Sequence, residues 1–92
     1  MIKIFNAKVK FSFLGKEEGK GLCFQLGFLC ANNTTFVTDI LPVNDMSIIN
    51  KIVSILEIKS WEEINRKFAR IKVQDGKIIE LGNILEERWI KL

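Results

Sequence analysis

The stretch SWEEINRKFARIKVQDGKII, residues 60–79, has the clearest local structural signals in this sequence. Ser60 and Glu63 have the spacing of a capping box, in which the serine oxygen and the glutamate carboxylate each accept a hydrogen bond from a free backbone amide at a helix start. The spacing therefore predicts a short helix from Trp61 to about Lys67.

The second half of the same stretch predicts a β-hairpin. Apolar and polar residues alternate over positions 69–74, which is typical of a strand with one buried face. Asp75 and Gly76 follow directly, and this pair favours a two-residue turn because both turn positions require positive φ angles. The chain is expected to return as a strand from Lys77 to Leu81.

The N-terminal third predicts an antiparallel meander. Residues 7–13 alternate with a period of two, which places Phe11 and Phe13 on the buried row of a first strand. The glycine-rich segment LGKEEGKG supplies a turn, and LCFQLGFLC, residues 22–30, is apolar on both faces, as expected of a central strand or of one that meets another subunit. ANNTT is a second turn, followed by a short strand in TFVTDIL that ends at Pro42.

Helices are expected in two further places. Asn44 or Asp45 can cap a helix whose apolar residues recur every three or four positions between Ile48 and Leu56. Asn83 repeats the capping spacing before ILEERWIKL, which predicts a terminal helix with Ile84, Leu85 and Trp89 facing inward. The expected order is β-β-β-α-α-β-β-α. This is an α+β domain over residues 1–92, with an antiparallel sheet of about five strands and helices packed on one face.

Length and composition limit the class of protein. Ninety-two residues, 48 % hydrophobic and 27 % charged, are enough for one folded domain. Apolar runs are far shorter than the roughly 20 residues needed to cross a bilayer, so a soluble, cytoplasmic protein without membrane contact is expected. Cys23 and Cys30 are expected to be buried free thiols, which fits a reducing compartment.

Residues that usually carry catalysis are scarce. The sequence has no histidine, which removes the commonest general base and metal ligand. The two cysteines do not have the spacing of a zinc site. GKEEGKG is one residue short of a phosphate-binding loop and has no hydroxyl residue after its lysine. We therefore expect neither an enzyme nor a bound metal or cofactor.

Basic residues form the main candidate binding surface. Arg70 and Lys72 share one face of the predicted strand, Lys8 and Lys10 share the polar face of the first strand, and the net charge is +3. If the two strands are neighbours, the pairs form one patch. The candidate binding residues are Lys8, Lys10, Arg66, Lys67, Phe68, Arg70 and Lys72. The alternative is that these residues only keep the strand faces solvated. Phe68 is the one aromatic residue expected on the basic row, which is weak support for base stacking.

Both ends of the chain resemble a group of small phage- and prophage-encoded accessory proteins. The matching positions are Asn6, Ala7, Ser60, Trp61, Glu62, Glu63, Arg70, Leu81, Gly82 and Trp89. Residues 19–39 match poorly. The resemblance implies a mobile-element origin and no catalytic residues. Many small phage proteins of this kind inhibit host defence systems such as CRISPR effectors, so the resemblance also implies an inhibitory role.

Three functional hypotheses follow. The first is a non-enzymatic, anti-CRISPR-like inhibitor that binds a host protein, for example a defence nuclease, by protein–protein contact. The second is a phosphate-recognising module that binds nucleic acid or sequesters a nucleotide through the basic residues. The third is an oligomeric structural protein that associates through the apolar strand Leu22 to Cys30.

Overall fold

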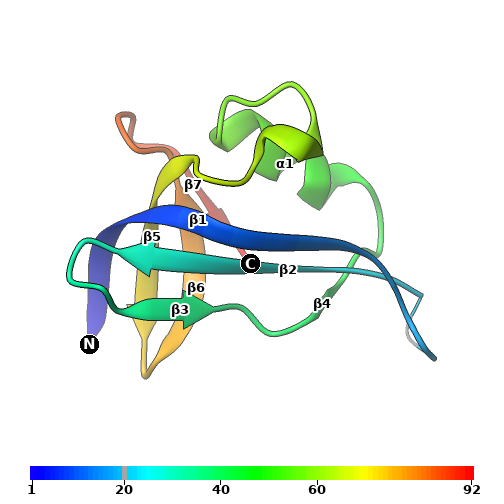
Figure 1. The fold of residues 1–92 in the computed structure, drawn as a ribbon, viewed down its shortest axis with the longest axis horizontal. Helices are drawn as coiled ribbons and strands as arrows, with labels where there is room; N and C mark the ends of the chain where they lie inside the picture. The colour runs from blue at the N-terminus through cyan, green and yellow to red at the C-terminus, as the bar shows by residue number, and fades with distance from the viewer. Residues whose placement is uncertain (20) are drawn as a thin grey trace.

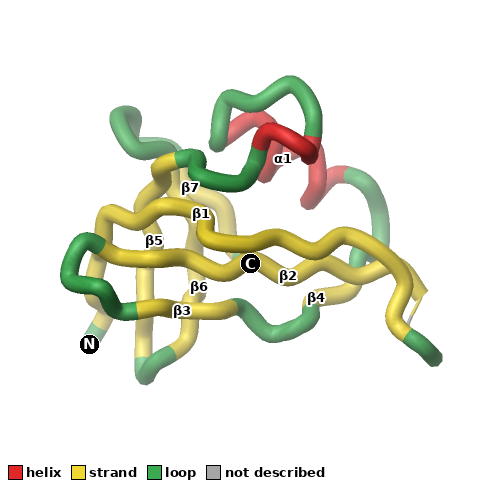
Figure 2. Tube along the Cα trace, in the orientation of Figure 1, coloured by secondary structure: helices red, strands yellow, loops and turns green. Residues whose placement is uncertain are grey.

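A computed structural model of the chain describes residues 1–19 and 21–92. In this part of the chain the elements, in order, are β1 (Ile2–Glu17), β2 (Gly21–Cys30), β3 (Thr35–Val37), β4 (Leu41–Pro42), α1 (Ser47–Ile55), the 3-10 turn η1 (Trp61–Glu63), β5 (Phe68–Gln74), β6 (Lys77–Gly82) and β7 (Trp89–Lys91). The expected α+β architecture is therefore wrong. The protein is predominantly β (Figure 2), and the described residues contain one α-helix and one 3-10 turn.

One antiparallel sheet holds all the strands, in the order β3-β2-β1-β5-β6-β7, and β4 also pairs with β2. The long strand β1 belongs to both halves of this sheet. Its first part, from Ile2 to Lys8, pairs with β5, and its later part, to Glu17, pairs with β2. The sheet bends along β1, so that β2 and β3 cross in front of β5 and β6 in Figure 1, and β3 comes close to β6.

The hydrophobic core fills the space between the two halves of the sheet. Phe24, Leu26 and Phe28 of β2 are fully buried against Ile71 of β5 and Leu81 of β6. Helix α1 lies at one end of this space, next to β7, and contributes its apolar stripe (Figure 1). Neither α1 nor η1 is long and apolar enough to cross a membrane in the part of the chain that is described.

Several local predictions are confirmed. β2 is a central strand, and most of its apolar residues are buried within the chain, whereas Leu22 and Leu29 are half-buried. Cys23 and Cys30 are buried free thiols. The β5–β6 hairpin turns at Asp75 and Gly76, whose φ angles are 53° and 78°. Helix α1 is present, but the predicted cap at Asn44 or Asp45 is wrong, because Met46 holds the N-cap position without a side-chain cap. Asp45 Oδ1 accepts a hydrogen bond from the Ser47 amide at 2.7 Å from one residue further out.

The second helix is shorter than predicted. The Glu63 carboxylate does accept from the amides of Lys59 at 2.6 Å and Ser60 at 3.1 Å, as the capping spacing indicates. The 3-10 turn nevertheless ends at Glu63, because the next residues are drawn into pairing with β1. Arg66 has a φ angle of 73°, which breaks the helix, and its amide donates to the Val9 carbonyl at 2.8 Å.

The predicted terminal helix is wrong. The Asn83 side chain accepts from the amides of Leu85 and Glu86, as a helix cap does, but the chain then turns and β7 pairs with β6. Leu85, expected to face inward, is 88 % exposed. The strand is favoured because Trp89 lies opposite Gly82, where its ring covers the glycine backbone.

The first strand contains an unpredicted β-bulge. Val9 pairs with Phe28 and Phe11 pairs with Gly27, so Lys10 is an extra residue on β1. A bulge of one residue exchanges the two faces of every later position. Ser12 and Leu14 therefore take the core side, and Phe11 and Phe13, expected on the buried row, lie on the outer side with 38 % and 37 % of their surface exposed.

Candidate functional site

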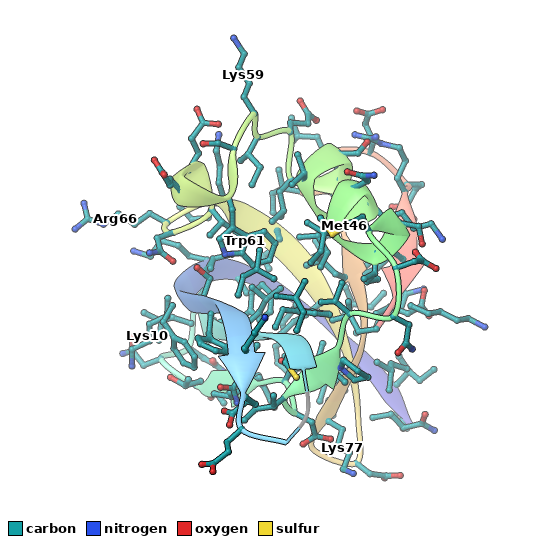
Figure 3. All side chains as sticks on the ribbon, turned by 90° about the vertical axis from the view of Figure 1, so that its right-hand side faces the viewer. Lys10, Met46, Lys59, Trp61, Arg66 and Lys77 are labelled. Carbon is teal, nitrogen blue, oxygen red and sulfur yellow. The ribbon has the colours of Figure 1, made fainter. Side chains whose placement is uncertain are left out.

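Four basic residues come together where β1 passes from β5 to β2. The Val9 amide donates to the Lys67 carbonyl and the Arg66 amide donates to the Val9 carbonyl, both at 2.8 Å. This pairing brings Arg66 and Lys67 beside Lys8 and Lys10, and we call these four residues the basic cluster. Lys10 and Arg66 project from the same side in Figure 3, which is the side that faces the viewer in Figure 1.

In the described part of the chain the basic cluster makes no close ion pairs with acidic side chains, and the carboxylate of Glu63 interacts with it only at longer range, through Lys67. The ion pairs found within residues 1–19 and 21–92 involve Arg70, Lys72 and Arg88, and none of the four cluster residues. Lys10, Arg66 and Lys67 are also exposed, and Lys8 is half-buried. The cluster is therefore a local excess of positive charge that can attract an anion.

Arg70 and Lys72 have a different environment. Their strand neighbours β1 as anticipated, but Arg70 stands opposite Asn6 and Lys72 opposite Ile4, so neither lies opposite Lys8 or Lys10. The Arg70 guanidinium donates to Glu87 Oε1 at 2.7 Å and to the carbonyls of Asn83 and Glu86. Lys72 pairs with Glu80 at 3.6 Å. Arg70 stabilises the turn before β7 and Lys72 pairs with β6, so neither belongs to the basic cluster.

Phe11 and Phe13 lie flat against glycine backbone on the outer face, by which we mean the side of β1, β2 and β3 directed away from the core. A Cβ atom placed on Gly27 would overlap the Phe11 ring, and one placed on Gly15 would meet the Phe13 ring at 3.2 Å. One side of each ring therefore covers a strand, and part of each ring remains exposed. Exposed aromatic rings of this kind are platforms on which another planar group can stack.

Trp89 is a third ring that lies against a glycine, and cationic side chains of the same chain contact this ring. Its ring covers Gly82 in the same way. Lys72 Nζ and the Arg70 guanidinium carbon lie 4.3 and 4.8 Å from the ring centroid, respectively, in cation–π contact. The cation–π contacts found in the described part of the chain are these two, so the rings of Phe11 and Phe13 have no such intramolecular cover.

A shallow hollow adjoins these residues. It has a volume of about 270 Å³ and is bordered by Lys8, Phe68 and the side chains of Asn6 and Asn33, with Leu29 and Cys30 among its apolar lining. The Phe68 ring is 62 % exposed. Burial in the core raises the pKa of the Cys30 thiol, so this cysteine is a poor nucleophile.

Comparison with protein-family models, curated proteins and solved structures found no match. The resemblance to small phage-encoded proteins and the phage origin that it implies therefore stay predictions. Among the residues that the structure describes, no three histidine, cysteine, aspartate or glutamate side chains converge as metal ligands.

The structure assembles part of the predicted site and adds to it. Lys8, Lys10, Arg66, Lys67 and Phe68 lie together, whereas Arg70 and Lys72 pair elsewhere. Sequence reasoning missed Phe11 and Phe13 because it assumed an unbroken period of two. Gly27, a glycine inside a strand of large apolar residues, was the available signal, since such a glycine often marks a close approach or a bulge.

Proposed function

We propose that this protein is a non-enzymatic binding protein that holds single-stranded nucleic acid on the outer face of β1, β2 and β3. The observation that carries the proposal is the combination of the partly exposed rings of Phe11 and Phe13 with the adjacent basic cluster, which makes no close ion pairs. Proteins that bind single strands use the same combination, because cations contact the phosphates while aromatic rings stack on the bases.

The relative order of the functional hypotheses changes for a physical reason. On the sequence alone, protein contact is the first hypothesis because catalytic groups are scarce and the strand Leu22 to Cys30 is apolar on both faces. With Phe11 and Phe13 also exposed, two further rings accompany the cations. A duplex keeps its base faces covered by stacking, so these rings favour a single strand over a double strand.

Salt dependence is the direct test. Single-strand affinity falls with a slope of about −0.7 per contacted phosphate on logarithmic axes, so four contacts by the basic cluster predict a slope of about −2.8. Fluorescence anisotropy with a labelled single-stranded oligonucleotide, measured over a series of salt concentrations, gives this slope. Absence of binding at low salt, or tighter binding of a duplex of the same sequence, would refute the proposal.

A pair of charge-reversal variants separates local contact from net charge. Lys10→Glu and Lys59→Glu change the net charge by the same amount, but Lys59 projects from a different end of the molecule (Figure 3). Lys10→Glu is expected to weaken binding and reduce the steepness of the salt slope by about 0.7 to 1. Lys59→Glu is expected to leave both nearly unchanged. Equal effects of the two variants would contradict a binding surface at the basic cluster.

Contact with a host protein remains a second candidate, favoured by Ile2 and Ile4. These residues lie on the outer side of the first half of β1 and are 50 % and 55 % exposed. Such a partner would be a defence nuclease or a similar effector in the host cytoplasm, a compartment that suits the two free thiols. Affinity capture from nuclease-treated lysate tests this candidate. One stoichiometric protein that is retained by the wild type and lost with Ile4→Asp supports it, and absence of such a protein counts against it.

A further inference from the structure

We infer that the protein holds its bound strand in an extended form, in which the bases on Phe11 and Phe13 lie apart and do not stack on each other. This inference rests on the proposed function, because it describes the conformation of the strand bound at that surface. It also narrows the class of ligand to flexible strands that lose little stacking of their own when they are extended.

The rings of Phe11 and Phe13 lie side by side on the outer face. Phe11 leans across to β2, where its ring covers Gly27. Phe13 leans along β1 toward Gly15. The close aromatic pair found within residues 1–19 and 21–92 involves neither ring, so they are not stacked on each other. A base that stacks on one ring therefore lies beside the base on the other ring, and not on top of it.

The distance between the two rings is larger than the distance between stacked bases. Phe11 and Phe13 are two residues apart on one strand, so their Cα atoms are about 7 Å apart. The rings lean in different directions, toward Gly27 and Gly15, so they are not brought closer than the Cα atoms. Neighbouring nucleotides in one strand of a duplex are separated by about 3.4 Å along the axis. Two bases on these rings are thus at least about twice as far apart as stacked bases.

The curvature of the sheet adds to this separation. The hydrophobic core fills the inner side of the bent sheet, and β1 curves around it (Figure 1), so the outer face is convex. Groups that stand away from a convex surface diverge from one another. Bases bound along β1 are therefore kept apart by the shape of the sheet as well as by the positions of the rings.

The basic cluster lies at one end of this row of rings. Lys8 and Lys10 precede Phe11 on β1, and Phe13 follows it on the side away from the cluster. Phosphates are bound at the cluster, and a base is bound further along β1 by Phe13. A base that leaves its neighbour to stack on a ring exchanges one stacking contact for another, so attraction of the phosphates to the cluster is enough to favour the extended strand.

The test measures the length and the stacking of the bound strand at saturating protein. An oligo(dA) strand of about six nucleotides, which is stacked when free, carries a donor dye at one end and an acceptor dye at the other. The wild type is expected to lower the energy transfer and to raise the ultraviolet absorbance of the bases, because the bound strand is longer and less stacked. Oligo(dT) stacks weakly when free, so it should gain less absorbance and bind more tightly than oligo(dA).

Two kinds of variant separate the rings from the charge. Phe13→Leu removes one ring, so it should lower the affinity by about 5-fold to 150-fold and give a smaller drop in energy transfer at saturation. Lys67→Gln is the control, because it removes one charge and keeps both rings. It should weaken binding and still reach the wild-type energy transfer at saturation. Phe11→Leu is a second ring variant, so the test does not depend on the folding of one protein, and thermal unfolding confirms that each variant is folded.

The outcomes distinguish this inference from the proposed function. If the wild type binds with the expected salt slope but leaves the energy transfer and the absorbance of oligo(dA) unchanged, the extended strand is refuted and the proposed function stands. The extended strand is also refuted if both ring variants reach the wild-type energy transfer at saturation, or if Lys67→Gln reduces the drop as much as they do. If the wild type binds no strand at low salt, both are refuted.

Discussion

Replacing Gly27 with alanine is the most informative test of the way the outer face is built. The new Cβ atom would occupy space now filled by the Phe11 ring. Because the ring is the far end of a flexible side chain and is already 38 % exposed, we expect it to swing into solvent while the strand keeps its course. The variant should therefore lose the ring platform and keep the fold.

The expected magnitudes differ for stability and for binding. Exposing a ring that is about three-fifths buried costs about 1–2 kcal/mol. Replacing glycine with alanine in a strand stabilises the folded state by about 0.5–1 kcal/mol, because alanine lowers the conformational entropy of the unfolded chain. The net loss in free energy of unfolding should thus be about 0–1.5 kcal/mol. Loss of one stacked base should weaken single-strand binding by about 1–3 kcal/mol, which is about 5-fold to 150-fold.

Gly82→Ala is the matched control. Its Cβ atom would overlap the Trp89 ring in the same way, but that ring is held by Arg70 and Lys72. Displacing it breaks these contacts, so we expect a loss of about 2–3 kcal/mol in stability, without a specific effect on binding by the folded fraction. Urea unfolding followed by tryptophan fluorescence and anisotropy on the same preparations measure both quantities. A loss of more than about 3 kcal/mol for Gly27→Ala, or unchanged binding, would refute the reasoning.

Three further predictions concern stability and reactivity. Asn83→Ala removes a buried amide that bonds the Ile55 carbonyl at 2.8 Å and two backbone amides, so thermal unfolding should show a loss of about 3–4 kcal/mol; a loss below about 1 kcal/mol would contradict this. The pKa of the Glu63 carboxyl is lowered by hydrogen bonds from two backbone amides, so its stabilisation is present above the ordinary glutamate pKa and is lost as pH falls through the lowered value. Below the ordinary glutamate pKa, the free energy of unfolding measured by urea titration should depend less on pH for Glu63→Gln than for the wild type. The same pH dependence for both proteins would argue against the cap. Cys23 and Cys30 should react with a thiol reagent only as fast as the protein opens, and rapid labelling of the folded protein would be inconsistent with their burial.

Local signals in the sequence were sufficient where a few neighbouring residues decide the structure. The turn at Asp75 and Gly76, the helix α1 and the central position of β2 were all predictable for this reason. Non-local pairing decided the rest. The helix after Ser60 ends early because Arg66 pairs with Val9, a partner that lies far away in sequence.

The candidate site shows the same division. The basic residues were visible in the sequence, but their grouping depends on the register between β1 and β5. The aromatic part was hidden by one inserted residue, since the bulge at Lys10 reverses the direction of Phe11 and Phe13. Nothing in the alternation of residues 7–13 indicates that the period of two is interrupted.

Because β1 pairs with both β2 and β5, the proposed binding surface is completed only late in the synthesis of the chain. The hairpin of β1 and β2 is local and can form as soon as both strands have left the ribosome, whereas β1 pairs with β5 from Ile2 opposite Gln74. Phe11 and Phe13 can thus reach their places early, but Arg66 and Lys67 join them only when most of the chain has been made. A nascent chain halted after β2 would expose the rings with only Lys8 and Lys10 of the basic cluster, and it should therefore associate with chaperones before it can retain a nucleic acid.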